Sequence, residues 1–199
     1  RDYESRNVTF VEPDGSWPIV WERVRGDHVW DAEGKKYLDL TAAFGVAAAG
    51  HANPNVVKSG QRQMAKLLHA MGDVHPHELK AKLARELSKI TFERWSSIGN
   101  RRSAIGNSAK TIFCNSGFEA VEAALKSAFL HTGKPGVIAF DGCYHGLGFG
   151  ALGAGGFARF RDPFLAQIPR FGVTLPFPHI HAPARSPGVQ AVLERVRSV

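Results

Sequence analysis

The stretch from residue 111 to residue 140 constrains the fold of this chain more than any other. Residues 111–114 and 137–140 are two short, mainly apolar runs, and residues 119–131 between them have the composition of a helix. Gly133 stands just past that segment, where a glycine commonly ends a helix. A strand, a helix and a strand within about thirty residues make a βαβ unit, which requires a parallel sheet. The pattern therefore predicts an α/β fold.

The first part of the chain has a different pattern. Residues 1–16 are polar and lack periodicity, which predicts an extended arm. Residues 18–40 hold three short strand-like runs separated by turns with Gly26 and Gly34, which predicts an antiparallel meander. We place a domain boundary after residue 53, so residues 1–53 form the arm and meander and residues 54–199 belong to a larger α/β domain. In that domain we predict helices at residues 54–71, 76–90 and 189–199, and long loops with one or two short helices at 146–188.

Composition argues against several kinds of partner. The formal net charge is +7, but the basic residues are scattered through amphipathic segments, so we do not expect nucleic-acid binding. No apolar run approaches the ~20 residues of a membrane span. Two cysteines, Cys114 and Cys143, are too few for a disulfide framework and predict reduced thiols in the cytoplasm. No metal site is predicted, because two histidine pairs lack an acidic or cysteine partner at motif spacing: His75 with His77, and His179 with His181.

The turn before the predicted helix at 119–131 has the chemistry of an anion site. Ligands of open α/β sheets bind at the carboxyl ends of strands, and the N-terminus of a helix favours a phosphate. Ser116 adds a hydroxyl donor there, and Gly117 allows the backbone to come close. The alternative is a capping box, in which Ser116 caps the helix and Glu119 reaches back. Both interpretations can hold at once.

A second loop follows the next predicted strand. It contains Tyr144 and His145, and the βαβ topology predicts that it lies beside the Ser116–Gly117 turn. A flat heteroaromatic ring held by its phosphate would fit against Tyr144. The alternative is that Tyr144 is a half-buried loop residue with no ligand. The two loops together favour a pocket for a phosphorylated ring.

Three segments carry a family resemblance. Residues 115–126 (NSGFEAVEAALK) and 144–146 (YHG) resemble the cofactor motifs of class III aminotransferases, and residues 26–54 are similar to the N-terminal signature of that family. The family consists of enzymes that depend on pyridoxal 5′-phosphate (PLP) and have fold type I. The resemblance implies an incomplete fold of this type: the N-terminal meander and helical segment, plus the first half of the large parallel-sheet domain.

The resemblance also implies roles for individual residues. Ser116, Gly117 and the backbone N–H of Phe118 would hold the PLP phosphate. Tyr144 would stack on the pyridine ring, and His145 would stand near the ring or the substrate. The remaining positions are in the N-terminal signature, where Gly45 and Val46 would approach the substrate and His51 would be structural.

The function implied is transfer of an amino group, an omega-amino group in much of the family, to a 2-oxo acid, by a homodimer. The Schiff-base lysine and the aspartate of the family have no counterpart here, so we assign no catalytic residue and interpret the chain as an inactive, aggregation-prone fragment. The alternative is an inactive PLP- or phosphate-binding remnant or an interaction module. A phosphate-ester-binding α/β protein unrelated to PLP is a third possibility.

One position departs from the family pattern. The family mostly has a small residue after the glycine, often one whose hydroxyl bonds the phosphate, and here it is Phe118. A hydrogen bond to a charged group is worth roughly 1.5–3 kcal/mol. The sequence alone therefore predicts that Phe118→Ser tightens PLP binding.

Overall fold

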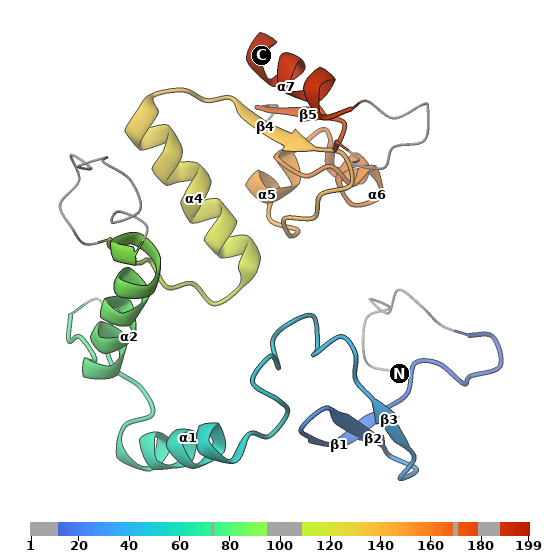
Figure 1. Ribbon diagram of the computed structural model, residues 1–199, viewed down its shortest axis with the longest axis vertical. Coiled ribbons are helices and arrows are strands. Elements are labelled where there is room, and N and C mark those ends of the chain that lie inside the picture. Colours follow the sequence, from blue (N-terminus) through green and yellow to red (C-terminus); the bar gives the residue numbers. More distant parts are fainter. Residues whose placement is uncertain (1–11, 73, 95–108, 169–170, 179–187) are drawn as a thin grey trace. The chain divides into compact units, whose positions relative to one another are not determined.

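The computed structural model describes residues 12–72, 74–94, 109–168, 171–178 and 188–199 (Figure 1). The chain folds as two compact units, Arg1–Lys80 and Ala81–Val199. This division falls within the first turn of helix α2 (Glu78–Ser88). The domain boundary that the sequence predicts after residue 53 stays a prediction.

The first unit contains the predicted meander. Strands β1 (Trp21–Arg25), β2 (His28–Asp31) and β3 (Lys36–Leu38) pair antiparallel in the order β1-β2-β3. Among the described residues of the first unit, Val29 in the central strand is the most deeply buried, at 1% exposure. The meander is therefore built around its middle strand, in which buried and partly exposed residues alternate.

The buried carboxylate of Asp31 holds the turn between β2 and β3. It accepts hydrogen bonds from the backbone N–H of Glu33 at 3.0 Å and of Lys35 at 2.8 Å, and from the hydroxyl of Tyr37 at 2.8 Å. Burial alone would raise the pKa of Asp31, but these donors together lower it below its ordinary value. The charge is thus satisfied within the turn.

Helix α1 (Pro54–Lys66) begins as predicted and ends early. The Oδ1 of Asn53 accepts from the N–H of Asn55 at 3.0 Å and caps the helix. The predicted end near residue 71 is wrong, because Leu67 is extended at φ −162°. The side-chain amide of Gln63 donates to the carbonyl of Leu67 at 2.8 Å and closes the helix end.

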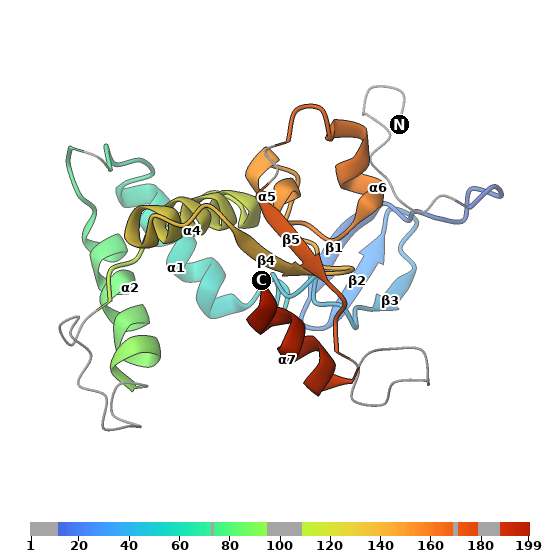
Figure 2. The ribbon, with the colours of Figure 1, turned by 90° about the horizontal axis from the view of Figure 1, so that it is seen from above.

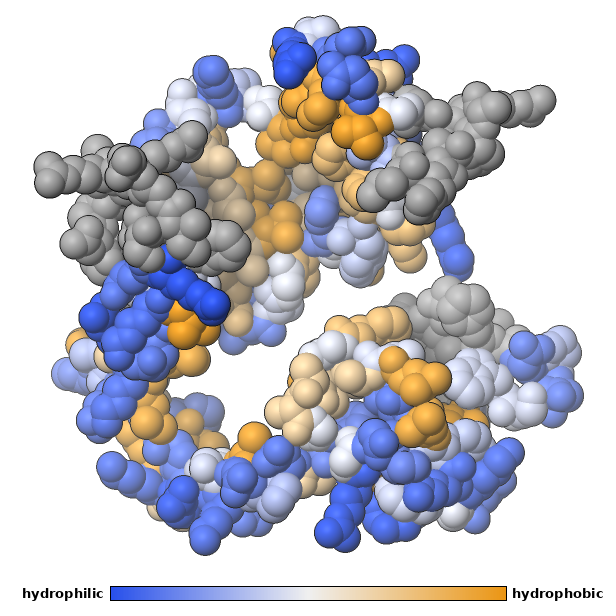
Figure 3. Space-filling view, in the orientation of Figure 1, coloured by the Kyte–Doolittle hydropathy of each residue, from blue (hydrophilic) through white to orange (hydrophobic). Residues whose placement is uncertain are grey.

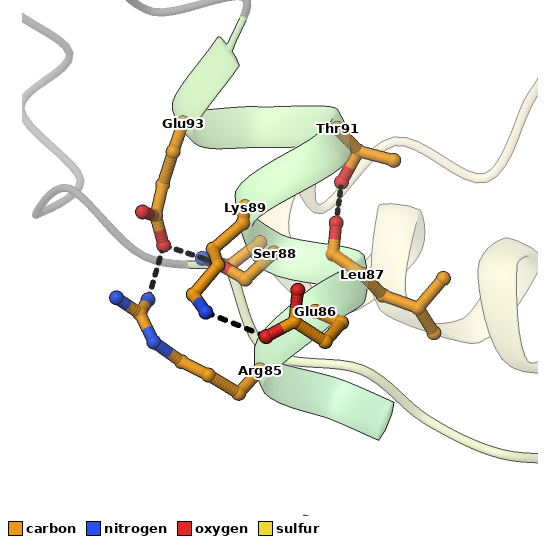
Figure 4. A network of polar contacts seen from close by, with 8 residues as sticks. Arg85, Glu86, Leu87, Ser88, Lys89, Thr91 and Glu93 are labelled. Carbon is orange, nitrogen blue, oxygen red and sulfur yellow. Dashed lines mark hydrogen bonds and ion pairs between the residues drawn. The ribbon is translucent and has the colours of Figure 1, made fainter. Parts of the chain in front are cut away.

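The C-terminal end of α2 carries a network of polar contacts around the buried Ser88 (Figure 4). The helix continues into a π-helical turn, Lys89–Glu93, and the hydroxyl of Ser88, only 2% exposed, donates to Glu93 at 3.0 Å. Ser88 also accepts from the N–H of Ala109 at 2.9 Å, and Arg85 pairs with Glu93. This network ties residue 109, where the described chain resumes, to the end of α2.

The second unit is built on a two-stranded parallel sheet. Strand β4 (Val137–Phe140) pairs with β5 (Gly172–Leu175), with Val137 opposite Gly172. In both views the helix α7 (Val189–Ser198) lies on one side of this sheet, and α5 (Phe149–Gly153) and α6 (Ala158–Arg161) lie on the other (Figure 2). A short 3₁₀ turn, Asp162–Phe164, follows α6. The parallel sheet and the helix at 189–199 are confirmed.

The partner of β4 differs from the prediction. Residues 109–114, which include the predicted strand at 111–114, have no strand in the structure. Instead β4 pairs with β5, inside the stretch predicted as loops and short helices. The sequence signal of β5 is weak, because the strand has four residues and begins with Gly172. That glycine is needed for space, since a Cβ there would lie 2.2 Å from the carbonyl oxygen of Gly153.

The core of the second unit is small in the described residues. Helix α4 (Gly117–Thr132) has no buried residue, although it is largely apolar. Apolar side chains are accordingly visible at its surface (Figure 3). No described helix combines the length and apolar character that crossing a membrane requires. In the described part of the second unit the buried apolar residues are Ala139, Ala151, Leu152, Ala154, Ile168, Leu175 and Val192.

Candidate functional site

The N-terminus of α4 is closed by a capping box. The Oγ of Ser116 accepts from the N–H of Glu119 at 3.3 Å, and the carboxylate of Glu119 accepts from the N–H of Ser116 at 3.1 Å and of Asn115 at 2.6 Å. The capping alternative predicted from the sequence is thus present. At the other end Gly133 is left-handed at φ 67°, as its position after the helix predicts.

The capping box leaves donors available at the same helix end. Because the Ser116 oxygen accepts from Glu119, its own proton remains free to be donated. Among the described residues, no acceptor bonds the N–H groups of Gly117 and Phe118. These three donors lie at the positive end of a helix of 16 residues. Capping and anion binding are therefore compatible here.

A pocket of about 500 Å³ brings the two predicted loops together. Its walls come from the start of α4 and from the loop after β4. Tyr144 is 57% exposed, and its ring packs at a steep angle on that of Phe160, with the ring centroids 5.6 Å apart. A volume of this size is in the range of small-ligand sites. The lining residues are Ser116, Gly117, Phe118, Val121, Tyr144, His145, Gly146 and Leu147.

Ser116 and Tyr144 line the same pocket, as predicted. They come together through contacts that side chains of α4 make with the loop after β4. Phe118 packs against Gly146 and Gly148 in the loop, where an added Cβ would collide with it. One turn later the carboxylate of Glu122 accepts from the N–H of Ala151 at 2.9 Å, in the first turn of α5. Glu122 was not selected from the sequence, where its only signal was the position one turn after Phe118.

The pocket has the chemistry that a phosphorylated pyridine needs. Three free donors at a helix N-terminus suit a phosphate dianion, and an aromatic face beside them suits a flat ring. No lysine is among the residues that line this pocket. The individual roles of Ser116, Gly117, Phe118, Tyr144 and His145 stay predictions.

The other predicted substrate residues lie in the first unit, on a strained turn. Ala42, Ala43 and Phe44 have φ of 50°, 49° and 57°, and Gly45 follows at 87°. Each non-glycine residue in this conformation costs roughly 1–2 kcal/mol. Val46 is exposed, and the role of Gly45 and Val46 toward a substrate stays a prediction.

The turn is held by two residues, one of which was not selected from the sequence. Asp39 accepts from the N–H and hydroxyl of Thr41, from the N–H of Ala43 and from the ring of His51. His51 also exchanges both backbone hydrogen bonds with Gly26. The structural role predicted for His51 matches this geometry. Asp39 could have been found from the Tyr-Leu-Asp step of the N-terminal signature.

The histidines at 75 and 77 lie outside both sites. The Nδ1 of His77 accepts from the N–H of Leu79 at 2.9 Å, at the start of α2. Within the described residues, no group of three acidic, histidine or cysteine side chains could hold a metal ion. His179 and His181 lie outside the described residues.

Comparison with known proteins identifies the same family as the motifs. The model of the family described as aminotransferase class-III matches residues 10–199. Acetylornithine aminotransferase from Methanopyrus kandleri is 36% identical over 155 residues, which are 78% of this chain and 36% of that protein. The 5-aminovalerate aminotransferase of Pseudomonas aeruginosa is 38% identical over 139 residues, which are 70% of this chain and 30% of that protein.

A solved structure has the same fold. The omega transaminase from Pseudomonas jessenii, in complex with PMP, matches with a TM-score of 0.71 and 25% identity. The match covers 91% of this chain and 39% of that one. This chain therefore spans less than half the length of the proteins it matches.

Proposed function

The chain belongs to the class-III aminotransferase family, and from this membership we propose that its pocket between α4 and residues 144–147 binds PLP. The protein would serve transfer of an amino group, in particular an omega-amino group, to a 2-oxo acid. One observation carries the proposal: the phosphate-type donors of α4 and the ring of Tyr144 line the same pocket. A generic helix N-terminus would offer the donors without the aromatic wall.

The phosphate would be held by the first turn of α4. Ser116 donates its hydroxyl proton, and Gly117 and Phe118 donate their backbone N–H groups, while Glu119 keeps the cap closed from the other side. The positive end of the helix dipole adds to these bonds. In this arrangement the chain itself supplies anchoring of the cofactor, without any lysine or arginine in the pocket wall.

The ring would lie against Tyr144, with His145 at its edge or near the substrate. When bound, the pyridine ring of PLP supplies an electron sink for the carbon that loses a proton. Tyr144 orients the ring and shields one face of it from water. On the family resemblance, the lysine and the carboxylate that the chemistry also requires would come from the second half of the large domain; neither is among the residues that line this pocket.

The names of relatives support the choice of substrate class. One relative is named for 5-aminovalerate, whose amino group is at the opposite end of the molecule from its carboxylate, and a solved relative is named an omega transaminase. We therefore propose an omega-amino donor and a 2-oxo acid acceptor. We propose a homodimer on the family resemblance. We propose a cytoplasmic location on the two free thiols, Cys114 and Cys143.

A titration with pyridoxamine 5′-phosphate (PMP) tests the pocket. PMP lacks the aldehyde of PLP, so it cannot react with surface lysines and reports on the pocket alone. We expect saturable binding that inorganic phosphate displaces and that Ser116→Ala weakens by about ten-fold, from loss of one charge-assisted hydrogen bond. Binding of PMP that neither phosphate nor this substitution affects would contradict the proposal.

The alternative function, an inactive PLP- or phosphate-binding remnant, predicts the same titration. The two functions differ in their expected activity. The remnant would not transaminate even when this chain is part of a longer protein that also contains the lysine and the aspartate of the family. A transaminase assay with 5-aminovalerate and 2-oxoglutarate on such a protein separates the two functions.

A further inference from the structure

The side chain of Phe118, in the turn proposed to bind phosphate, packs against Gly146 and Gly148 of the next loop. We call the space that it fills beside these two glycines its seat. A Cβ atom added to Gly146 would lie 2.2 Å from the Cβ of Phe118, and one added to Gly148 would lie 2.7 Å from its Cδ2. Both distances are far below van der Waals contact, so only glycine fits beside this ring. Gly146 also has φ of 104°, a conformation that favours glycine.

The contact continues along the same face of α4. Glu122 is four residues after Phe118, so the two side chains lie on one face, one turn apart. A Cβ on Gly150 would lie 2.4 Å from the Glu122 carboxylate, which accepts from the N–H of Ala151. Three alternate glycines thus face two side chains of α4. In addition, the Glu122 carboxylate accepts a hydrogen bond from a backbone N–H group in the first turn of α5.

This packing fixes the loop that carries the aromatic wall. Tyr144 is two residues before Gly146, so the Phe118 contact restrains the loop on one side of Tyr144, and the backbone hydrogen bonds of Cys143 with Phe140 and Gly156 restrain it on the other. We propose that Phe118 is a positioning residue: its ring, seated on Gly146 and Gly148, holds Tyr144 at the pocket. This role rests on the proposed function, because the ring that Tyr144 covers belongs to the proposed cofactor.

A positioning role for Phe118 opposes the expectation from sequence. By sequence alone, Phe118→Ser tightens binding because it adds a hydroxyl donor. The same change removes the ring that lies against Gly146 and Gly148. On our proposal, the loop that carries Tyr144 is then no longer held at the pocket. We therefore expect weaker binding of a ring-bearing ligand.

A double-mutant cycle tests the seat without any ligand. Gly148 has φ −66° and ψ 150°, which alanine adopts without strain, so Gly148→Ala acts through the space that its Cβ needs: 2.7 Å from the ring of Phe118 and, less tightly, 3.0 Å from the carboxylate of Glu122. Overpacking should lower the urea midpoint by about 0.5–1 M in the Phe118 background and by much less in Phe118→Ala. Gly136→Ala is the matched control, because nothing lies within 4 Å of a Cβ there. Equal effects of Gly148→Ala in both backgrounds would overturn the seat.

Ligand binding then separates positioning from general damage. Phe118→Ala should weaken PMP about five-fold, in the range of one aromatic contact, and leave the inhibition constant of inorganic phosphate unchanged. Phe118→Leu should restore most of the PMP affinity. Equal losses for PMP and phosphate would show a merely structural role, and tighter PMP binding by Phe118→Ser would support the expectation from sequence; either result overturns positioning. If the unmodified protein failed to bind PMP, the proposed function would fall as well.

Discussion

The Nε2 of His51 lies 2.7 Å from the Oδ2 of Asp39, and the two side chains are only 10% and 5% exposed. The pair joins the end of the meander to the residues just before α1. Between them runs the left-handed turn at Ala42, Ala43 and Phe44. A turn with this much unfavourable backbone persists only when its surroundings hold it. The pair, with the other donors to Asp39, is what holds it.

Substitution of Asp39 should release this turn. Phe44 at its tip is fully exposed, and chymotrypsin cleaves after phenylalanine once the backbone can open. Because Asp39→Ala removes the acceptor for Thr41, Ala43 and His51, we expect cleavage after Phe44 to become roughly ten-fold faster. Asp27→Ala is the control, since Asp27 is largely exposed and lies outside the turn. Equal cleavage rates for both variants would contradict the role of Asp39.

The pair of Asp39 and His51 also predicts that the stability of the fold depends on pH in the acid range. The hydrogen bond from His51, and then those from Thr41, hold the pKa of Asp39 well below its ordinary value of 3.8. A depressed folded-state pKa means that the stabilisation is present above pH 3.8 and is lost as the pH falls below it. Urea midpoints, followed by the fluorescence of Trp21, which packs on His51, should fall less steeply below this pH in Asp39→Asn than in the unmodified protein. Parallel pH profiles would show that Asp39 is not the group responsible.

Ser116 has a structural and a binding role that can be separated. Loss of its cap should cost about 1 kcal/mol of stability in Ser116→Ala. Ser116→Thr keeps the hydroxyl, so it should retain both the cap and the affinity for PMP. Urea unfolding measures the first effect and PMP titration the second. An affinity for PMP that is equal in Ser116→Ala and Ser116→Thr would leave only the capping role.

Tyr144 should contribute through its ring and not through its hydroxyl. Tyr144→Phe keeps the aromatic face, and we expect PMP affinity within about two-fold of the unmodified protein, whereas Tyr144→Ala should lose about ten-fold. The affinity for inorganic phosphate should be the same in both variants, since the phosphate donors are in α4. A loss in Tyr144→Phe as large as in Tyr144→Ala would show that the hydroxyl acts instead.

Local signals in the sequence were sufficient for most elements. The predicted start of a helix at residue 54 and the predicted helix end before Gly133 are confirmed, because capping depends on a few neighbouring backbone groups. The end of α1 was misplaced, because the side chain of Gln63 closes it. The predicted strand at 111–114 was wrong, because an apolar run of four residues carries no information about which strand it would pair with.

The sequence by itself determined the family, the parallel α/β class and five of the residues that line the pocket, because turn, cap and motif chemistry are local. Only the tertiary structure decided how Ser116 and Tyr144 come together. The sequence predicted that two adjacent strands would align their loops, but β4 pairs with β5, and the loops meet because Phe118 and Glu122 pack on alternate glycines. Such packing depends on the space between side chains some thirty residues apart, and that space exists only after the chain has folded.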